Sequence, residues 1–393
     1  MLTYPFDTPA GMDVDPQGVE LLAQAPVARA RLKTGQEVWL ALGYDAVREV
    51  LTDPRFSREA ATRPGSPVTN QAGNNPELLI GMDPPRHTRI RSLMGRAFSP
   101  RMVQRLEPRI TAIVDDLLDQ MVAGGRPADL VRMFAEPLPI MVICELLGVP
   151  DTDSAQIRHW AGVLISEGAY SPDEIVAAIG EIDGYLAKLI AERRVAPDDA
   201  LISALIAVND EGNHLSPTEL VSNVQLLLVA GHETTVSQIG NSVVTLMHHP
   251  EQAALLRERP DLLSPGVDEL LRHSKLATAI VPRVATEDVL VGGTVIRAGE
   301  AAIPIVSVAN RDPAAFPDPH RFDVTRTGPA PHVGLGHGPH FCLGAQLARL
   351  ELRIALGALL TRFPTLSPAV DLADLDWKEG LSTRALRTLP VTW

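Results

Sequence analysis

Cysteine is scarce in this sequence, with two residues among 393, and this scarcity excludes a disulfide-stapled extracellular fold. Cys144 lies in an apolar run, Ile140 to Leu147, and we expect it in the core. The N-terminus lacks the basic start and the apolar stretch of a signal peptide or membrane anchor, so we expect a cytoplasmic protein. Internal repeats and low-complexity segments are also absent from the sequence. The net charge of −13 argues against nucleic acid as a partner.

Apolar residues make up 45% of the chain, which is enough for a large core, and no Gly/Ser linker or charge block divides it. Amphipathic patterns separated by short polar breaks predict a mainly α fold. Short alternating runs around 280–305 and 365–393 predict small antiparallel sheets beside the helices. The sequence therefore predicts a single helical domain over residues 1–393 with a minor β-rich region.

The second cysteine, Cys342, lies in the glycine-rich stretch from Leu335 to Arg349. A helical pattern of leucines begins directly after it, so we expect Cys342 at the N-terminus of a helix, where free N–H groups and the helix dipole favour a thiolate. Gly336 and Gly344 leave little side-chain cover, which allows a large flat group to approach the backbone. A thiolate in such a place suits the axial position of haem iron. The alternative is a buried, inert cysteine in a glycine-rich turn.

A long central helix is predicted between Ser216, which opens a capping box, and Pro250. About 33 residues at 1.5 Å each give roughly 50 Å, so this helix must cross the middle of the domain. Its centre carries the polar run 230–235, which is costly in a buried helix unless it is used or satisfied as a polar core network. Gly231 permits a close approach by a flat ligand. A zinc-protease site is excluded, because the position four residues after His232 is valine.

Two further pairs have the spacing that places side chains on one face of a helix. His87 and Arg91 follow a double proline that starts a helix, and alone they indicate a solvated basic surface. Glu269 and Arg272 alone indicate an exposed ion pair of small worth. The Pro-rich stretch 310–323 cannot be regular helix or strand.

These segments, in their order along the chain, resemble the cytochrome P450 family of haem-thiolate monooxygenases. The stretch from Leu335 resembles the family signature Phe-Gly-x-Gly-x-His-x-Cys-x-Gly and departs from it at Leu335. The run 230–234 resembles the oxygen-activation motif Ala-Gly-x-Glu/Asp-Thr, and 269–272 resembles the motif Glu-x-x-Arg. The resemblance extends from about Trp39 to the C-terminus. It includes soluble bacterial class I members, among them actinomycete enzymes that tailor macrolides, other polyketides and steroid-like molecules.

The resemblance implies haem b as the cofactor, with the Cys342 thiolate as the axial ligand of the iron. It also implies a set of residues around the cofactor that bind the propionates or let the ring approach the backbone. The implied propionate partners are His87, Arg91, Arg283 and His340, and the implied close-approach glycines are Gly231, Gly336 and Gly344.

Two further groups of residues are implied by the same resemblance. Glu233 would feed protons inward, and Thr234 would hold the oxygen and its water by hydrogen bonds. Glu269 and Arg272 would form a buried structural pair, joined by Arg321 from the Pro-rich stretch.

The implied activity is insertion of one oxygen atom of O2 into a hydrophobic small molecule, by hydroxylation of a macrolide, polyketide, terpenoid or steroid-like secondary metabolite. No Gly-x-Gly-x-x-Gly follows a strand, so electrons must come from outside, from a ferredoxin and its NAD(P)H-dependent reductase. The same haem chemistry leaves epoxidation, oxidative coupling and peroxide-driven oxidation as alternatives. A non-catalytic haem-binding partner protein is an alternative of another class. We expect a monomer without membrane attachment.

Two surfaces also follow from the resemblance. The ferredoxin would dock on a set of basic residues: Arg89, Arg96, Arg101, Arg349 and Arg353. The alternative is that these arginines are a solvated charge run without a partner protein. The substrate would meet mostly aliphatic segments, including a break near 168–172 that is either a lid or an ordinary helix–helix turn. These segments are 58–80, 160–171, 223–230, 275–282 and 381–383.

Leu335 stands where the family has a phenylalanine that packs close to the haem and the ligand loop. We predict that haem still binds, because the ligand and the propionate partners are intact. The change Leu335→Phe should shift the reduction potential or the turnover, because the shell around a thiolate tunes the metal. Potentiometric titration and turnover of both proteins check this, and identical values for both quantities contradict it.

Overall fold

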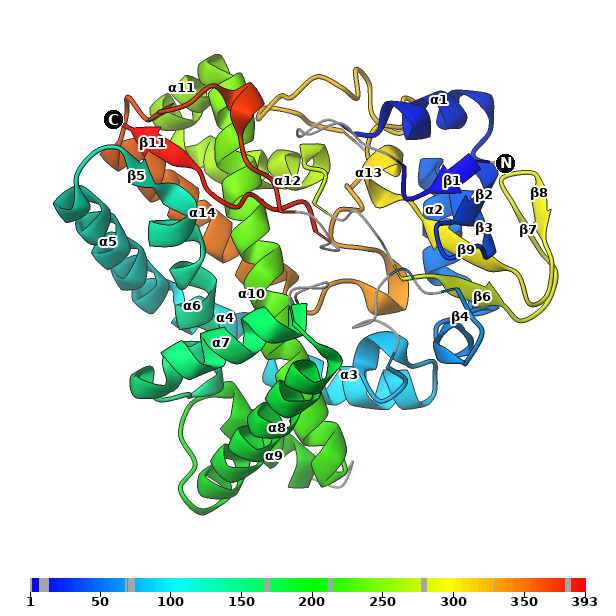
Figure 1. Ribbon diagram of the computed structural model, residues 1–393, viewed down its shortest axis with the longest axis horizontal. Coiled ribbons are helices and arrows are strands. Elements are labelled where there is room, and N and C mark those ends of the chain that lie inside the picture. Colours follow the sequence, from blue (N-terminus) through cyan, green and yellow to red (C-terminus); the bar gives the residue numbers. More distant parts are fainter. Residues whose placement is uncertain are drawn as a thin grey trace.

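The computed structural model describes residues 2–6, 14–67, 69, 75–165, 170–210, 215–276, 281–328, 330–378 and 383–393. Most of the chain is helical (Figure 1). The helices are α1 (Pro16–Gln24), α2 (Tyr44–Thr52), α3 (Arg86–Ala97), α4 (Pro100–Arg105), α5 (Glu107–Gly124), α6 (Pro137–Leu147), α7 (Ser154–Ile165), α8 (Pro172–Val195), α9 (Leu201–Asp210), α10 (Pro217–His248), α11 (Pro250–Glu258), α12 (Leu263–His273), α13 (Val306–Ala309) and α14 (Ala345–Arg362).

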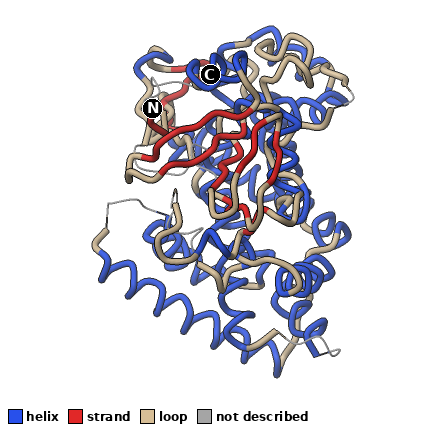
Figure 2. Tube along the Cα trace, turned by 90° about the vertical axis from the view of Figure 1, so that its right-hand side faces the viewer, coloured by secondary structure: helices blue, strands red, loops and turns tan. Residues whose placement is uncertain are grey.

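Most of the strands lie together on one side of the helical layer (Figure 2). The strands are β1 (Leu2–Tyr4), β2 (Val27–Leu32), β3 (Glu37–Ala41), β4 (Phe56–Ser57), β5 (Ala128–Asp129), β6 (Arg283–Ala285), β7 (Val289–Val291), β8 (Thr294–Ile296), β9 (Ala301–Pro304), β10 (Ser367–Pro368) and β11 (Pro390–Thr392). Of these, β5 and β11 lie beside α5, across α10 from the largest sheet (Figure 1). The largest sheet has the order β1-β2-β3-β9-β6-β4, and smaller sheets have the orders β10-β11-β5 and β7-β8.

Helix α10 crosses the middle of the molecule, with the largest sheet on one side and α5, α6 and α14 on the other (Figure 1). Its capping box is formed, since Glu219 N–H donates to Ser216 Oγ at 3.0 Å and Ser216 N–H donates to Glu219 Oε2 at 2.9 Å. Every residue from 235 to 246 is buried. The helix is 32 residues long and contacts α6, α8 and α14, so the predicted central helix is confirmed.

The hydrophobic core is divided between the helical layer and the sheet. The largest cluster of buried side chains lies among the helices and includes residues of α3, α5, α6, α10 and α14. Two smaller clusters cover the faces of the largest sheet, one against α2 and one against the N-terminal segment. The loop that carries Cys342 lies between these regions, because Leu335 and Leu343 pack against the helical cluster and Gly338 lies against Thr52 of α2.

The sheet region differs from the prediction in one respect. The β7–β8 and β10–β11–β5 pairings are antiparallel as expected, but β1 pairs with β2 and β3 pairs with β9 in parallel. Parallel neighbours need a long crossover, and β9 returns to β3 after most of the helical layer has been built. The largest sheet is therefore mixed, because its strands come from both ends of the chain. Among the described helices, none is long and apolar enough to cross a membrane.

Candidate active site

The loop that carries Cys342 is closed by a hydrogen bond from the Cys342 N–H to the Leu335 carbonyl at 2.9 Å. Gly336 and Gly338 have φ angles of 78° and 68°, in the left-handed region that favours glycine. A Cβ on Gly338 would also lie 2.7 Å from Thr52 Cγ2 at the end of α2. The glycines therefore allow the turns of the loop and its close packing against α2.

Cys342 is half-buried and lies two residues before Gly344, the N-cap of α14. A Cβ built on Gly344 would meet no atom within 4 Å, so the backbone beside the sulfur is uncovered. Burial raises the pKa of the Cys342 thiol, while the Gly344 N–H, Arg91 and Arg349 oppose that increase. In the chain without a ligand, burial therefore raises the pKa of this thiol by more than the helix N-terminus and the two arginines lower it.

A group of basic side chains from distant segments surrounds this loop. His87 of α3 stacks on His340, with ring centroids 4.1 Å apart, and Arg91 of α3 donates a hydrogen bond to the carbonyl of Phe341. Arg283 of β6 is buried. Arg58 was not predicted as a member, but it is buried and donates to the Ile80 carbonyl at 2.9 Å and to the Pro282 carbonyl. The structure thus brings the four predicted basic residues together and adds Arg58, for which the sequence carried no motif.

The positive charge of the basic cluster is not balanced by an equal number of nearby acids in the described part of the chain. Burial, Arg283 and His87 lower the pKa of His340 to about 2. Burial lowers the pKa of Arg283 to about 10, and burial with repulsion from Arg283 lowers that of Arg58 to about 9. Asp83 is the one acid that acts on these groups in the opposite direction within the described part of the chain.

Two buried donors of this cluster have no hydrogen-bond acceptor among the described residues: His87 Nε2 and Arg283 Nε. Buried polar groups are nearly always satisfied, so donors left over beside uncompensated positive charge indicate a site for an anionic group. Two carboxylates of one ligand fit this donor set. The residues present therefore fit the propionates of a haem.

The central helix opens a polar, thinly covered face in its middle. Thr234 Oγ donates to the Ala230 carbonyl at 2.7 Å, and Thr235 Oγ donates to the Gly231 carbonyl at 2.9 Å. Ala230 is exposed and both Gly231 and Thr234 are half-exposed, although residues 235–246, which follow them, are buried. A Cβ on Gly231 would lie 3.5 Å from the side chain of Ile143, which is an ordinary packing distance. The exposure of Ala230, Gly231 and Thr234 therefore shows that this face of α10 is only partly covered.

The surroundings of the buried Glu233 include partners that the sequence did not reveal. Its buried carboxylate lies 3.6 Å from Lys378 Nζ, and Lys378 lies 3.5 Å from Glu136 Oε1, directly before α6. The neighbouring His232 ring lies 3.3 Å from the Glu136 carbonyl. Burial raises the pKa of Glu233, Lys378 opposes the increase, and Glu136 adds to it. The carboxyl thus holds its proton more strongly than an exposed glutamate.

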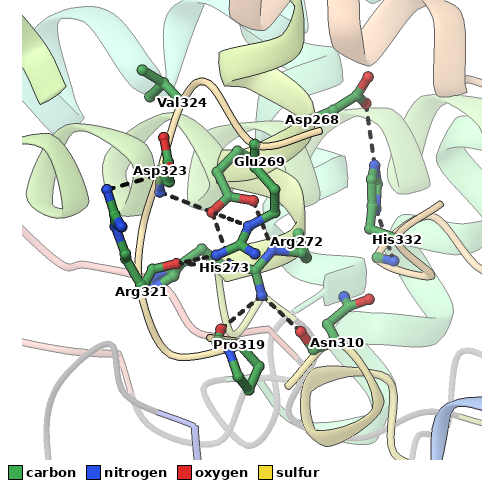
Figure 3. A network of polar contacts seen from close by, with 12 residues as sticks. Asp268, Glu269, Arg272, His273, Asn310, Pro319, Arg321, Asp323, Val324 and His332 are labelled. Atoms are coloured by element: carbon green, nitrogen blue, oxygen red, sulfur yellow. Dashed lines mark hydrogen bonds and ion pairs between the residues drawn. The ribbon is translucent and has the colours of Figure 1, made fainter. Parts of the chain in front are cut away.

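A buried ion pair lies at the end of α12 (Figure 3). Arg272 donates to both oxygens of Glu269, at 2.7 and 2.8 Å, and also to the carbonyls of Asn310 and Pro319, each at 2.8 Å. Glu269 accepts a further bond from the Asp323 N–H at 3.0 Å. Both side chains are almost completely buried, so the pair is structural and not the exposed pair of the alternative interpretation.

Arg321 is not the third member of this network, and that prediction is wrong. Its side chain is 67% exposed and lies 3.6 Å from Asp323, while only its carbonyl accepts bonds from the network. Arg326 takes the predicted place, with Nε 3.2 Å from Glu269 Oε1 and a side chain 16% exposed. Arg321 lies on a turn that begins at Asp318, and the next turn brings Arg326 back to the carboxylate.

Arginines expected on the docking surface form ion pairs with neighbouring acids. Arg89 lies 2.8 Å from Glu219, Arg349 lies 2.7 Å from Asp268, and Arg353 lies 2.8 Å from Glu107. Asp268 also lies 3.1 Å from the buried His332 (Figure 3). Arg96 and Arg101 are exposed. The net positive charge of this surface is therefore smaller than the sequence indicates.

Comparison with known proteins agrees with these motifs. The family model "Cytochrome P450" matches residues 172–389. The nocardicin C N-oxygenase of Nocardia uniformis subsp. tsuyamanensis is 44% identical, with 100% of this chain and 98% of that protein covered. The chain belongs to the cytochrome P450 family. The mycinamicin IV hydroxylase/epoxidase of Micromonospora griseorubida is 43% identical over 99% of this P450 and 98% of that protein. The crystal structure of the LnmA cytochrome P450 hydroxylase from Streptomyces atroolivaceus superposes with a TM-score of 0.94, at 43% identity and full coverage of both chains.

Family membership makes this protein an oxidoreductase, a P450 monooxygenase of the bacterial secondary-metabolism type, and implies a haem-thiolate cofactor. Some predicted pocket elements lie outside the described residues: 166–169 of the expected lid, 277–280, and 381–382 of the expected C-terminal turn. Parts of 58–80 also lie outside them.

The buried network predicts a difference between two arginines. Arg326→Ala leaves a buried carboxylate short of a donor, so it should lower the free energy of unfolding by about 2 kcal/mol. Arg321→Ala removes an exposed side chain and should change it by less than about 0.5 kcal/mol. Urea denaturation of both haem-loaded variants measures the difference. Equal losses, or a larger loss for Arg321→Ala, would contradict the assignment of Arg326.

Proposed function

We propose that this P450 binds haem b between the open face of α10 and the Cys342 loop, and hydroxylates a hydrophobic secondary metabolite. The observation that carries the proposal is the buried, unpartnered donor set of His87 and Arg283 beside the half-buried Cys342. Cys342 would hold the haem iron as a thiolate. Burial raises the pKa of the Cys342 thiol in the chain alone, and a bound metal ion would favour loss of that proton.

The basic cluster would hold the cofactor by its two propionates. His87, Arg91, Arg283 and His340 supply the donors, and Arg58 adds positive charge behind them. Charge-assisted bonds to carboxylates are stronger than neutral ones. The propionates would also relieve the mutual repulsion that lowers the pKa values of these side chains.

When bound, a haem with a thiolate ligand supplies the activation of O2, which together with a C–H bond, two electrons and two protons gives an alcohol and water. The chain supplies the rest. Leu226, Leu227 and Val229 are half-buried apolar side chains on α10 before the open face, and they suit a hydrophobic substrate. The substrate class is proposed from these side chains and from the relatives that act in macrolide and related metabolism.

Glu233 and Thr234 would deliver the protons. The Thr234 hydroxyl proton is committed to the Ala230 carbonyl, so the lone pairs of its oxygen remain available to accept a hydrogen bond on the open face. Glu233 is buried, whereas its partners Lys378 and Glu136 have side chains that are 22% and 37% exposed. The three groups would therefore join the buried acid to solvent without opening the site to bulk water.

Electrons would come from a ferredoxin and its NAD(P)H-dependent reductase. Arg96 and Arg101 are the exposed members of the expected docking surface, and an acidic ferredoxin would meet them there. We also propose that the chain acts as one domain and as a cytoplasmic monomer. The continuous contacts of α10 with helices from both halves of the chain support the single domain.

The outcome of the oxidation is proposed as hydroxylation. Relatives at 43–44% identity are named as a hydroxylase/epoxidase and as an N-oxygenase, so similar chains carry several oxygen-transfer activities. Product analysis with a panel of macrolides, polyketides and steroids tests the proposal. We expect a product that gains one oxygen atom from 18O2 at a C–H position. An epoxide or an N-oxide would show that the activity is epoxidation or N-oxygenation and not hydroxylation.

The ligand assignment predicts a spectroscopic difference between the two cysteines. The reduced, carbon-monoxide-bound protein should show the strongly red-shifted Soret band of a thiolate-ligated haem, and Cys342→Ala should abolish it, because a thiolate opposite the gas shifts the band. Cys144→Ala is the matched control, since Cys144 lies in the core between α6 neighbours, and should keep the band. A red-shifted band that survives Cys342→Ala would refute the assignment.

The Glu233 partners predict an effect of pH. Lys378→Met removes the positive charge that lowers the pKa of Glu233, so the carboxyl should remain protonated to higher pH than in the parent. Infrared difference spectra can follow the C=O band of that acid, which Glu233→Gln identifies. Product formation per NADH should fall by about tenfold when proton delivery is impaired. Lys378→Arg should restore both, and Lys188→Met, at an exposed lysine of α8, should alter neither. An unmoved band in Lys378→Met would remove Lys378 from the path.

A further inference from the structure

A small cavity lies outside the proposed active site, where α10, the end of α12 and α13 meet the segment that leads to the Cys342 loop. Its volume is about 20 Å³. The polar residues that line it come from three separate parts of the chain, and apolar side chains and Gly334 complete the wall. The polar lining residues are Gln238, Ser274, Ser307 and Asn310.

Three of these residues have a buried polar atom without a hydrogen-bond partner among the described residues: Gln238 Oε1, Ser274 Oγ and Asn310 Nδ2. Gln238 and Asn310 are 2% and 1% exposed, and Ser274 is 6% exposed. A buried polar group without a partner is destabilising and rare, so three around one cavity indicate a ligand that satisfies them together.

The chemistry of the three atoms selects the ligand. Asn310 Nδ2 can only donate, because its partner atom Oδ1 already accepts from the Val333 N–H at 2.9 Å, which fixes the orientation of the amide. Gln238 Oε1 can only accept, since Gln238 Nε2 donates to Ser242 Oγ at 3.1 Å. A cation would meet the Asn310 donor, and an anion would meet the Gln238 acceptor. A ligand that donates and accepts at once is required.

The volume of the cavity also indicates a single water molecule. A single water needs about 10–15 Å³ of such volume and typically makes about three hydrogen bonds in a protein interior. The cavity of about 20 Å³ offers that space and three polar partners. We infer that the structure holds a site for one buried water, bound by Gln238 Oε1, Ser274 Oγ and Asn310 Nδ2, that ties α10 to the segment leading into the Cys342 loop.

The connections of Asn310 show what the water joins. Its Oδ1 holds the Val333 N–H, two residues before the loop closed by Leu335 and Cys342, and its carbonyl accepts from Arg272 (Figure 3). Gln238 lies one helical turn after Thr234 on α10. The water therefore completes a hydrogen-bonded chain from the helix of the oxygen-handling face to the loop of the cysteine. This inference does not depend on the roles proposed for Glu233 or Thr234.

A crystal structure of the haem-loaded protein at high resolution tests the site directly. We expect one ordered water within hydrogen-bond distance of Gln238 Oε1, Ser274 Oγ and Asn310 Nδ2. A dry cavity, or a direct hydrogen bond between the Gln238 and Asn310 side chains across it, would overturn the proposal.

Two matched serine variants test whether the water supports the loop. Ser274→Ala removes one partner of the water and should weaken its density and speed amide exchange at Val333 by about fivefold, the scale of one net hydrogen bond. Ser307→Ala makes the same change in the wall of the same cavity, but the Ser307 hydroxyl is not among the unpartnered atoms. It should leave the density and the exchange rate unchanged. Equal exchange rates in the two variants would refute the connection to the loop.

Discussion

The buried pair of Glu269 and Arg272 fixes the position of the irregular segment 310–323. A buried ion pair is stable only when its remaining hydrogen-bonding capacity is filled, and here backbone carbonyls and an N–H from the segment 310–323 fill it. That segment contains several prolines and has no regular structure, so no helical or sheet hydrogen bonds hold its backbone. The arginine thus substitutes for secondary structure. The loop of Cys342 follows directly from a segment that is held in this way.

The basic cluster illustrates the opposite balance of charge. At the α12 pair each buried charge has its partner, whereas around His340 the basic side chains face one another with Asp83 as the nearby acid. Such an arrangement is destabilising in the chain alone, because burial and repulsion both disfavour the charged forms. The packing of α3, β6 and the loop must offset the free energy that this repulsion costs, and an anionic ligand would reduce that cost. Uncompensated positive charge among buried side chains is therefore the clearest physical mark of the site.

The sequence predicted those parts of the structure whose cause is local. The capping box at Ser216 and the stop at Pro250 define α10, and the glycines around Cys342 define its loop, because both depend on neighbours in the chain. The prediction from sequence was wrong where the spacing of residues alone had to identify the side chain that bonds to Glu269. Arg321 and Arg326 lie five residues apart in the same irregular segment, and only the path of two successive turns decides which one reaches Glu269. Long-range partners such as Lys378 have no local signature at all.

The polar residues of α10 show why a motif by itself does not reveal function. Thr234 and Thr235 satisfy their hydroxyl protons within the helix, so their cost of burial is small and their oxygens remain available. Glu233 depends on a lysine that lies 145 residues downstream, and Gln238 depends on a cavity between three segments. Each polar group is thus balanced by a different source: the helix itself, a distant charge, or a bound solvent molecule. Only the first of these can be read from the sequence, because the other two are properties of the assembled interior.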